Sequence, residues 1–122
     1  MTKTICLLPG DGIGGEVIPA AAEILAALDL GLSTETQPVG WECFQETGSA
    51  LPESTLAAVN RCRVALFGAT SSPSGGAPGY RSPILDLRQQ LNLYANLRPA
   101  QSLPVAASRA NIDILIVREN TE

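Results

Sequence analysis

The chain has 122 residues and a formal net charge of −4, and 45% of its residues are hydrophobic while 16% are charged. This length and composition predict a globular domain with a real core and argue against intrinsic disorder. The acidic balance offers no basic surface for nucleic acid or for an anionic membrane, and no apolar run approaches a membrane span. With no basic and apolar leader at its start, the chain is expected in the cytoplasm.

Residue usage narrows the chemistry. Arginine supplies all but one of the eight basic residues, which suits carboxylate or phosphate ligands because the planar guanidinium grips either with two hydrogen bonds. Because histidine is absent, acid–base chemistry within this chain is limited to Asp, Glu, Lys, Tyr or water. Cys6, Cys43 and Cys62 are odd in number and form no C-x-x-C pair, so we expect free thiols used in packing.

Alternating strands and helices are predicted from the start of the chain. A short apolar run at residues 4–8 indicates a buried strand that stops at Pro9. The apolar residues of 15–30 recur with a helical period, and Gly31 marks the end of that helix. A weakly alternating strand, a short helix opened by proline and a third buried strand are expected at residues 32–39, 52–60 and 64–67.

The second half begins with a loop of small residues at 68–79. Ser82 and Pro83 then predict the cap and first position of a helix that reaches about residue 91. Two further strands are expected at residues 93–97 and 112–117. This alternation predicts an α/β fold with a largely parallel sheet. Because only polar residues follow the last apolar run, we expect an incomplete chain.

The first predicted turn contains a glycine motif. Residues 10–15 satisfy G-x-G-x-x-G between a strand and a helix, the pattern that lays a pyrophosphate on a helix N-terminus in dinucleotide-binding folds. Asp11 opposes that role, because it places a carboxylate where two phosphate charges would lie. The acidic residue expected about 20 positions later is also missing, since Glu35 lies within a predicted strand. We therefore reject the Rossmann interpretation; glycines that only form a sharp turn remain an alternative.

Four sequence blocks, in order, resemble the β-decarboxylating dehydrogenases, the family of isocitrate, isopropylmalate, homoisocitrate and tartrate dehydrogenases. The blocks are L-P-G-D-G-I-G-G-E-V-I (8–18), F-G-A-T-S-S-P (67–73), L-R-Q-Q-L-N-L-Y-A-N-L-R-P (87–99) and V-R-E-N-T-E (117–122). The resemblance implies a three-layer α/β/α isopropylmalate dehydrogenase-like fold rather than a true Rossmann fold. It further implies an N-terminal fragment, in which residues 1–99 begin the first, large domain and residues 100–122 begin the second, dimer-forming domain.

Three arginines are the main candidates for substrate binding. Arg88 lies on the helix that follows Ser82, and Arg98 and Arg118 are each expected at the end of a strand. Strand ends are where ligands sit in open α/β sheets, so the three guanidinium groups are expected to face a common cavity and bind the substrate carboxylates. Ser82 is a further candidate, because a helix N-terminus can offer a hydroxyl and N–H groups to a carboxylate; it also serves as a plain cap.

The resemblance implies that Thr70, Ser71 and Ser72 contact the nicotinamide end of the cofactor, with Ser72 also near the substrate. An ordinary turn is the alternative for this loop. Other polar and aromatic residues are interpreted as structural rather than chemical: Trp41, Tyr80 and Tyr94 as packing, and Glu119 and Glu122 as hydrogen-bonding or ion-pairing residues.

Substrate choice is expected on the helix after Ser82. Isocitrate enzymes resemble R-S-L-N-x-x-L-R there, with a polar Asn at the substrate, whereas this chain has Ile84 at that position and Leu85 next to it. Isopropylmalate enzymes also carry an apolar pair here. The fuller strings G-Y-x-S-P-I-x-x-L-R and L-Y-A-N-L-R-P most resemble homoisocitrate dehydrogenases, although some of these carry arginine where Leu85 stands.

The resemblance thus implies oxidative decarboxylation of homoisocitrate to 2-oxoadipate, as in lysine biosynthesis through 2-aminoadipate, by a homodimer or homotetramer. Hydride would pass to NAD and carbon dioxide would then leave, with Mg²⁺ or Mn²⁺ as Lewis acid. The catalytic Lys and Tyr and the metal-binding aspartates are expected downstream of this segment. Isopropylmalate or isocitrate dehydrogenase, a non-catalytic regulatory paralogue and a Rossmann dehydrogenase are the alternatives.

Overall fold

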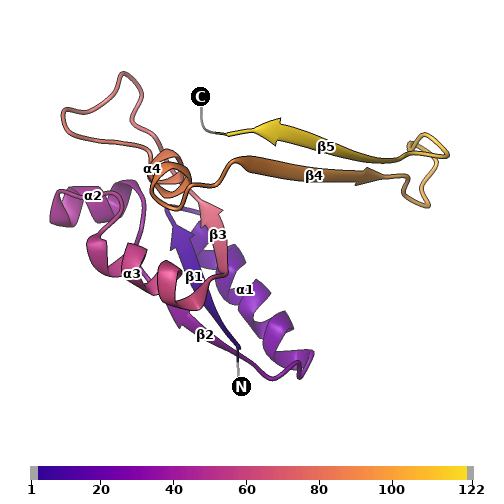
Figure 1. Cartoon of the computed structure of the whole chain (residues 1–122), viewed down its shortest axis with the longest axis horizontal. Coiled ribbons are helices and arrows are strands. Elements are labelled where there is room, and N and C mark those ends of the chain that lie inside the picture. The colour runs from indigo at the N-terminus through magenta and orange to yellow at the C-terminus, as the bar shows by residue number, and fades with distance from the viewer. Residues whose placement is uncertain (1–2, 121–122) are drawn as a thin grey trace. The chain divides into compact units, whose positions relative to one another are not determined.

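The computed structural model describes residues 3–120, and these form two compact units that divide between Leu87 and Arg88 (Figure 1). The first unit contains three strands and three helices: β1 (Lys3–Gly10), α1 (Gly14–Ala27), β2 (Leu32–Thr36), α2 (Trp41–Thr47), α3 (Glu53–Cys62) and β3 (Ala65–Ala69). Helix α4 (Pro83–Gln90) crosses the division, and the second unit contains β4 (Ala95–Gln101) and β5 (Asp113–Glu119). The domain boundary expected between residues 99 and 100 stays a prediction.

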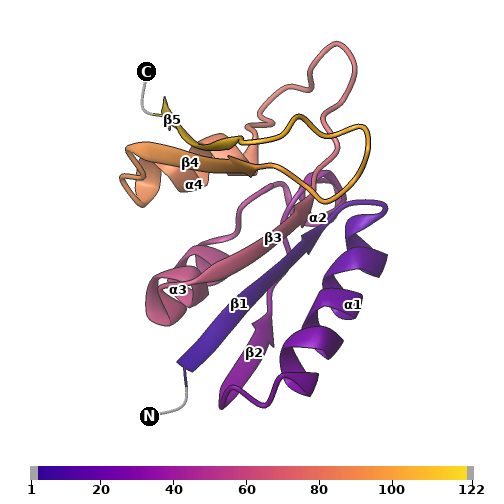
Figure 2. The ribbon, with the colours of Figure 1, turned by 90° about the vertical axis from the view of Figure 1, so that its right-hand side faces the viewer.

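The first unit is a three-layer α/β structure. Its strands form a parallel sheet in the order β2-β1-β3, with β1 in the centre. Figure 2 shows α1 along one face of this sheet and α3 along the other. Cys6, Leu7 and Leu8 are consecutive and all buried, as expected for a central strand covered on both faces. The predicted α/β fold is therefore confirmed, with small shifts of the element boundaries.

Helix α2 was not predicted from the sequence. It has seven residues and stands between two glycines with positive φ, Gly40 at 109° and Gly48 at 80°. Its buried residue is Cys43, and its aromatic residues Trp41 and Phe44 stack with ring centroids 5.5 Å apart. This confirms the packing role expected of Trp41. The N–H groups of Trp41 and Glu42 donate to Asp11, which directly follows β1, so α2 begins beside the carboxyl end of that strand.

The turn after β1 requires glycine at position 10. Gly10 has a φ of +76°, and a Cβ there would lie 1.9 Å from the backbone oxygen of Ala69 on β3. That oxygen accepts a hydrogen bond from the N–H of Asp11 at 2.8 Å. The close approach of the two strand ends therefore excludes any side chain at position 10.

Gly10→Ala is expected to lower the free energy of unfolding by on the order of 3 kcal/mol, because it combines a strained φ with a backbone clash. Gly15→Ala is the matched control, since a Cβ at Gly15 meets nothing within 4 Å and the residue lies in α1. The control is expected to be neutral or stabilising by up to about 1 kcal/mol. Thermal unfolding of both variants checks this, and equal midpoints would contradict it.

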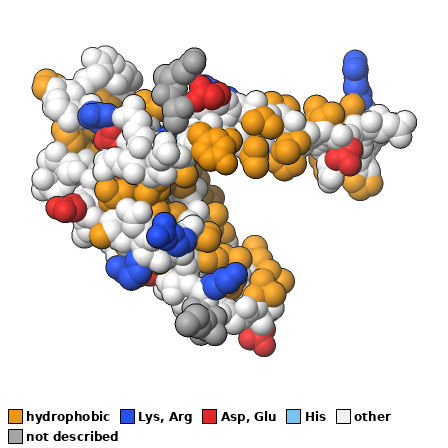
Figure 3. All heavy atoms as spheres, viewed as in Figure 1, with side chains coloured by type: hydrophobic (Ala, Val, Ile, Leu, Met, Phe, Trp, Pro, Cys, Tyr) orange, Lys and Arg blue, Asp and Glu red, His pale blue; other side chains and the backbone are white. Residues whose placement is uncertain are grey.

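The second unit is an antiparallel hairpin in which β4 pairs with β5 from Ala95↔Glu119 to Gln101↔Asp113. Apolar side chains of β4 and β5 are exposed along it, as Figure 3 shows. The strand expected at residues 93–97 starts later, because the N–H of Leu93 donates to the carbonyl of Arg88 at 2.8 Å and Asn92 has a positive φ of 52°. Both residues thus close α4. Tyr94, expected to pack, is instead 75% exposed.

Candidate functional site

The glycine loop after β1 is built around a buried carboxylate. Asp11 is only 2% exposed. Its Oδ2 accepts the N–H of Trp41 at 2.9 Å and that of Ser71 at 2.7 Å, while its Oδ1 accepts the N–H of Glu42 at 2.9 Å. Three backbone donors therefore bind this carboxylate. A phosphate bound by the loop would meet a negative group already in place, which confirms that the motif is no pyrophosphate cradle.

Glu35, the acidic residue nearest to the position that binds the ribose in a Rossmann fold, is part of an ion pair. Glu35, in β2, forms an ion pair with Arg61 of α3, whose Nη2 lies 2.5 and 2.6 Å from the two carboxylate oxygens. The hydrogen bonds from Arg61 and then from Gln37 lower the pKa of Glu35 below its usual value. Glu35 is therefore an ionised structural partner, as its position within a strand suggested.

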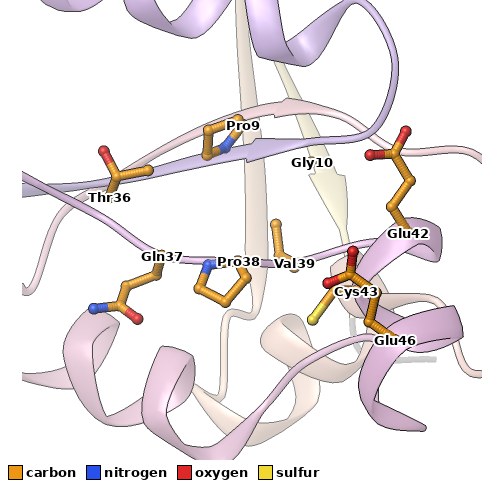
Figure 4. Close-up of a pocket in the computed structure, with 9 residues that line it drawn as sticks. All are labelled: Pro9, Gly10, Thr36, Gln37, Pro38, Val39, Glu42, Cys43 and Glu46. Carbon is orange, nitrogen blue, oxygen red and sulfur yellow. The ribbon is translucent and has the colours of Figure 1, made fainter.

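A cavity of about 320 Å³ opens beside the ends of β1 and β2 (Figure 4). Its acidic lining comes from α2, which contributes Glu42 and Glu46; the full lining is Pro9, Gly10, Thr36, Gln37, Pro38, Val39, Glu42, Cys43 and Glu46. Two carboxylates and no cation make this cavity unsuitable for phosphates. A second cavity of about 520 Å³, beside the start of β1, includes Lys3, Arg61 and Arg63 in its lining.

The cysteines serve packing. Cys6 and Cys43 are buried, Cys62 is half-buried, and all three are free. Burial, and then the neighbouring Cys62 and Glu35, raise the pKa of the Cys6 thiol to about 11 against a smaller opposing effect of Arg61. Cys6 therefore stays protonated at neutral pH and is unsuited to act as a nucleophile.

The loop predicted to contact the nicotinamide follows β3. The second and third strands of the chain lie on opposite sides of β1, so the loop begins beside the topological switch point, where open α/β sheets bind ligands. Thr70 is half-buried there, and Ser71 and Ser72 are exposed. The backbone of Ser71 is bound on both sides: its N–H by Asp11 and its carbonyl by the hydroxyl of Tyr80 at 3.0 Å. This loop therefore combines a fixed backbone at Ser71 with exposed hydroxyl groups at Ser71 and Ser72, and its contact with a cofactor stays a prediction.

Helix α4 presents the residues expected to choose the substrate. Ser82 directly precedes it, and its carbonyl accepts the N–H of Asp86 at 3.1 Å, as for a capping residue. Leu85 is 53% exposed, so its side chain is open to a ligand. Arg88 follows three residues later and therefore lies on the same side of the helix; it is half-buried.

Arg98 and Arg118 share one face of the β4–β5 hairpin. Asn96 is paired directly with Arg118, and Arg98 follows Asn96 by two residues, so all three side chains point the same way. The Nε of Arg98 donates to the side-chain oxygen of Asn96 at 3.2 Å. The strand-end expectation is wrong for Arg98, which lies in the middle of β4, because pairing with β5 continues the strand through Pro99 to Gln101. Arg118 is the penultimate residue of β5.

The shared cavity expected for Arg88, Arg98 and Arg118 stays a prediction. None of the predicted binding residues contributes to the two cavities described above. Within residues 3–120, no group of three or more His, Cys, Asp or Glu residues could hold a metal ion. Glu119 has interactions of its own, and Glu122 lies outside the described residues. No helix described here has the length and apolar character needed to cross a membrane.

Sequence reasoning missed two residues of this region. Asp11 was singled out only as an obstacle to phosphate, yet its carboxylate joins the turns after β1, β2 and β3. Tyr80 was assigned to packing, which is confirmed by its edge-on contacts with Trp41 and Phe44 at 5.3 Å, but its hydroxyl also binds Ser71. No local sequence pattern predicts the contacts of Asp11 or the hydrogen bond from Tyr80 to Ser71.

The sequence family model described as isocitrate/isopropylmalate dehydrogenase matches residues 4–122. The chain belongs to this family. It is 49% identical over 122 residues to the isocitrate/homoisocitrate dehydrogenase of Thermus thermophilus, covering all of this chain and 36% of that protein. It is 46% identical over 119 residues to the 3-isopropylmalate dehydrogenase of Methanothermobacter thermautotrophicus, covering 97% of this chain and 34% of that protein.

Solved structures agree with this family membership. The crystal structure of a β-decarboxylating dehydrogenase from Thermococcus kodakarensis matches with a TM-score of 0.83 at 44% identity, over all of this chain and 35% of that one. The isopropylmalate dehydrogenase-like fold is thus confirmed. The chain spans about a third of the length of these relatives. The two named dehydrogenases differ in the substrates that their names give, isocitrate/homoisocitrate for one and 3-isopropylmalate for the other.

Proposed function

We propose that the enzyme containing this chain catalyses the NAD-dependent oxidative decarboxylation of homoisocitrate to 2-oxoadipate. The observation that carries the choice of substrate is the apolar pair Ile84–Leu85 on α4, one turn before Arg88, with Leu85 exposed. Isocitrate enzymes present polarity at the position of Ile84. Family membership supports the reaction class, and this helix supports the substrate.

In this proposal the arginines hold the substrate carboxylates. Arg98 and Arg118 are diagonal neighbours on one face of the hairpin, and residues in that relation lie about 7–8 Å apart. Two guanidinium groups at that spacing can each take one of the two carboxylates that remain in the product, and Arg88 would add a further contact to one of them. Neutralising the carboxylates that remain leaves the departing carboxylate free of a cation. Ser72, and Ser82 at the start of α4, would add hydrogen bonds.

The proposed reaction has two steps, oxidation of the hydroxyl group and then loss of a carboxylate. Hydride leaves the carbon that bears the hydroxyl group for NAD, and the hydroxyl proton is released as the ketone forms. The carboxylate β to the new carbonyl then departs as carbon dioxide, and the remaining carbanion is protonated. Thr70, Ser71 and Ser72 would orient the nicotinamide for the first step. Bound Mg²⁺ or Mn²⁺ would supply a Lewis acid, and the metal ligands, the catalytic Lys and the catalytic Tyr would come from the remainder of the proposed enzyme.

Isopropylmalate is the second candidate substrate, because an exposed Leu85 would also suit a branched apolar group and a 46% identical relative carries that name. A regulatory paralogue that binds substrate without turning it over is the candidate of another class. The Arg88, Arg98 and Arg118 set favours catalysis, since a regulatory subunit has no need for a complete set.

The enzyme is expected to oxidise homoisocitrate with NAD and Mg²⁺ at least about tenfold more efficiently than isocitrate, because apolar Ile84 and Leu85 leave the isocitrate carboxylate without a partner. Initial rates of NADH formation with each acid, isopropylmalate included, check this. Comparable kcat/KM for homoisocitrate and isocitrate would remove the specificity claim. A preference for isopropylmalate would establish the second candidate, and binding without turnover would establish the regulatory one.

A further inference from the structure

We propose that Asp11 and Tyr80 are positioning residues that together fix the backbone of Ser71, and so hold in place the loop that would meet the nicotinamide. The role in catalysis rests on the proposed function. The two contacts stand on the geometry of the first unit alone.

The N–H of Ser71 is bound by a carboxylate that is itself immobile. Ser71 donates to Asp11 Oδ2 at 2.7 Å, across 60 residues of sequence. The same carboxylate accepts the N–H groups of Trp41 and Glu42, both at 2.9 Å, at the start of α2. Because Asp11 is buried and bound by three donors, it cannot swing away without breaking all three bonds. Ser71 is therefore tied to β1 and α2 at once.

The carbonyl of Ser71 is bound from the other side. The hydroxyl of Tyr80 donates to it at 3.0 Å. The Tyr80 ring meets Trp41 and Phe44 edge-on, with centroids 5.3 Å away in both cases. Both tethers therefore end on α2, one at its first N–H groups and the other at its aromatic side chains. A displacement of α2 would move both ends of the Ser71 backbone together.

Gly40 makes this arrangement possible. Its φ is +109°, and a Cβ there would lie 2.6 Å from each oxygen of the Asp11 carboxylate. A residue without a side chain is thus needed for the carboxylate to reach the first N–H groups of α2.

Within the loop itself, the backbone hydrogen bonds are local: the N–H of Gly76 donates to the carbonyl of Pro73 at 3.1 Å, and the N–H of Tyr80 donates to that of Ala77 at 3.0 Å. Between Ser72 and Tyr80 the chain contains Gly75, Gly76 and Gly79, all with positive φ, and such a segment has high conformational freedom. Tethering Ser71 on both sides removes that freedom beside β3 and fixes the direction in which Ser72 leaves. Orientation of a cofactor by a fixed loop acts on the rate of hydride transfer. Loosening the loop should therefore lower kcat and weaken NADH binding while the fold persists.

The test compares Asp11→Asn and Tyr80→Phe in the complete enzyme with Thr55→Val. Thr55 is fully buried and donates to the carbonyl of Pro38 at 2.8 Å, so its loss removes one buried hydrogen bond without touching Ser71. Amide hydrogen exchange of the segment at residues 70–73 is measured first. It should accelerate about three- to tenfold in each loop variant, the effect of one lost hydrogen bond, and should not change in Thr55→Val.

Function is read separately. The affinity for NADH is measured by NADH fluorescence. This affinity and kcat should each fall about three- to tenfold in Asp11→Asn and Tyr80→Phe, while KM for the acid changes less. If Asp11→Asn does not fold, Tyr80→Phe alone decides, because it leaves the Tyr80 ring against Trp41 and Phe44. Unchanged exchange at residues 70–73 in Tyr80→Phe would overturn the tether, and faster exchange with unchanged NADH binding and kcat would overturn its role. Should the parent enzyme reduce NAD with none of the acids, the proposed function fails, while the exchange data still decide the tether.

Discussion

Leu85→Arg is expected to raise the ratio of isocitrate to isopropylmalate efficiency by about tenfold to a hundredfold, the range of one charge-assisted contact worth about 1.5–3 kcal/mol. Leu85 is exposed on α4 and lies one turn before Arg88. An arginine there would meet the terminal carboxylate of isocitrate, which sits on a shorter arm than that of homoisocitrate. The same cation would crowd the branched apolar group of isopropylmalate.

The measurement is kcat/KM for homoisocitrate, isocitrate and isopropylmalate in the variant and its parent. Leu85→Met is the matched control, because it keeps the volume and apolar character of leucine and adds no charge. Its three efficiencies should keep their parental ratios. An isocitrate-to-isopropylmalate ratio that does not rise in Leu85→Arg would show that Leu85 does not face the variable end of the substrate.

Removal of Arg118 should have a larger effect. Arg118→Met is expected to lower kcat/KM for homoisocitrate by about two orders of magnitude or more, since leaving a bound carboxylate without its cation costs about 3–5 kcal/mol. Arg98→Met should act similarly, because Arg98 shares its face of the hairpin. Arg118→Lys should recover only part of the loss, because an ammonium group keeps the charge but not the two-pronged geometry.

Arg109→Met is the control for lost charge. Arg109 is exposed and lies in the connection between β4 and β5, away from the paired residues. The kcat/KM of Arg109→Met for homoisocitrate should stay within about twofold of the parent value, as expected for a surface substitution. A similar loss in Arg109→Met and Arg118→Met would mean that general charge, rather than a specific contact, supports binding.

The elements predicted correctly carry local signals. Strand β1 follows from an apolar run ended by Pro9-Gly10, and α4 follows from Ser82-Pro83. Helix α2 has no comparable signal, because its first N–H groups are capped by Asp11 from 30 residues away. The turn after α4 at residues 92–93, which delays the start of β4 to Ala95, was missed, since a positive φ at Asn92 is not visible in an apolar pattern.

The candidate site shows the same division. The resemblance identified Arg98 and Arg118 as candidates, and the pairing of β4 with β5 places them on one face of the hairpin. Their common face could not be predicted from sequence spacing, because it depends on the register of the two strands. Asp11 was recognised as an obstacle to phosphate from its charge alone. Its tether to Ser71 spans 60 residues and exists only once β1 and β3 are neighbours in the sheet.

The reaction itself is tested most directly by its stoichiometry. The complete enzyme is incubated with homoisocitrate, NAD and Mg²⁺, and NADH, carbon dioxide and 2-oxoadipate are measured in the same samples. Oxidation followed by loss of the β-carboxylate predicts equal amounts of all three products at every time point. NADH without carbon dioxide, or no NADH at all with substrate bound, would contradict the assignment of this chain to an oxidative decarboxylase of homoisocitrate.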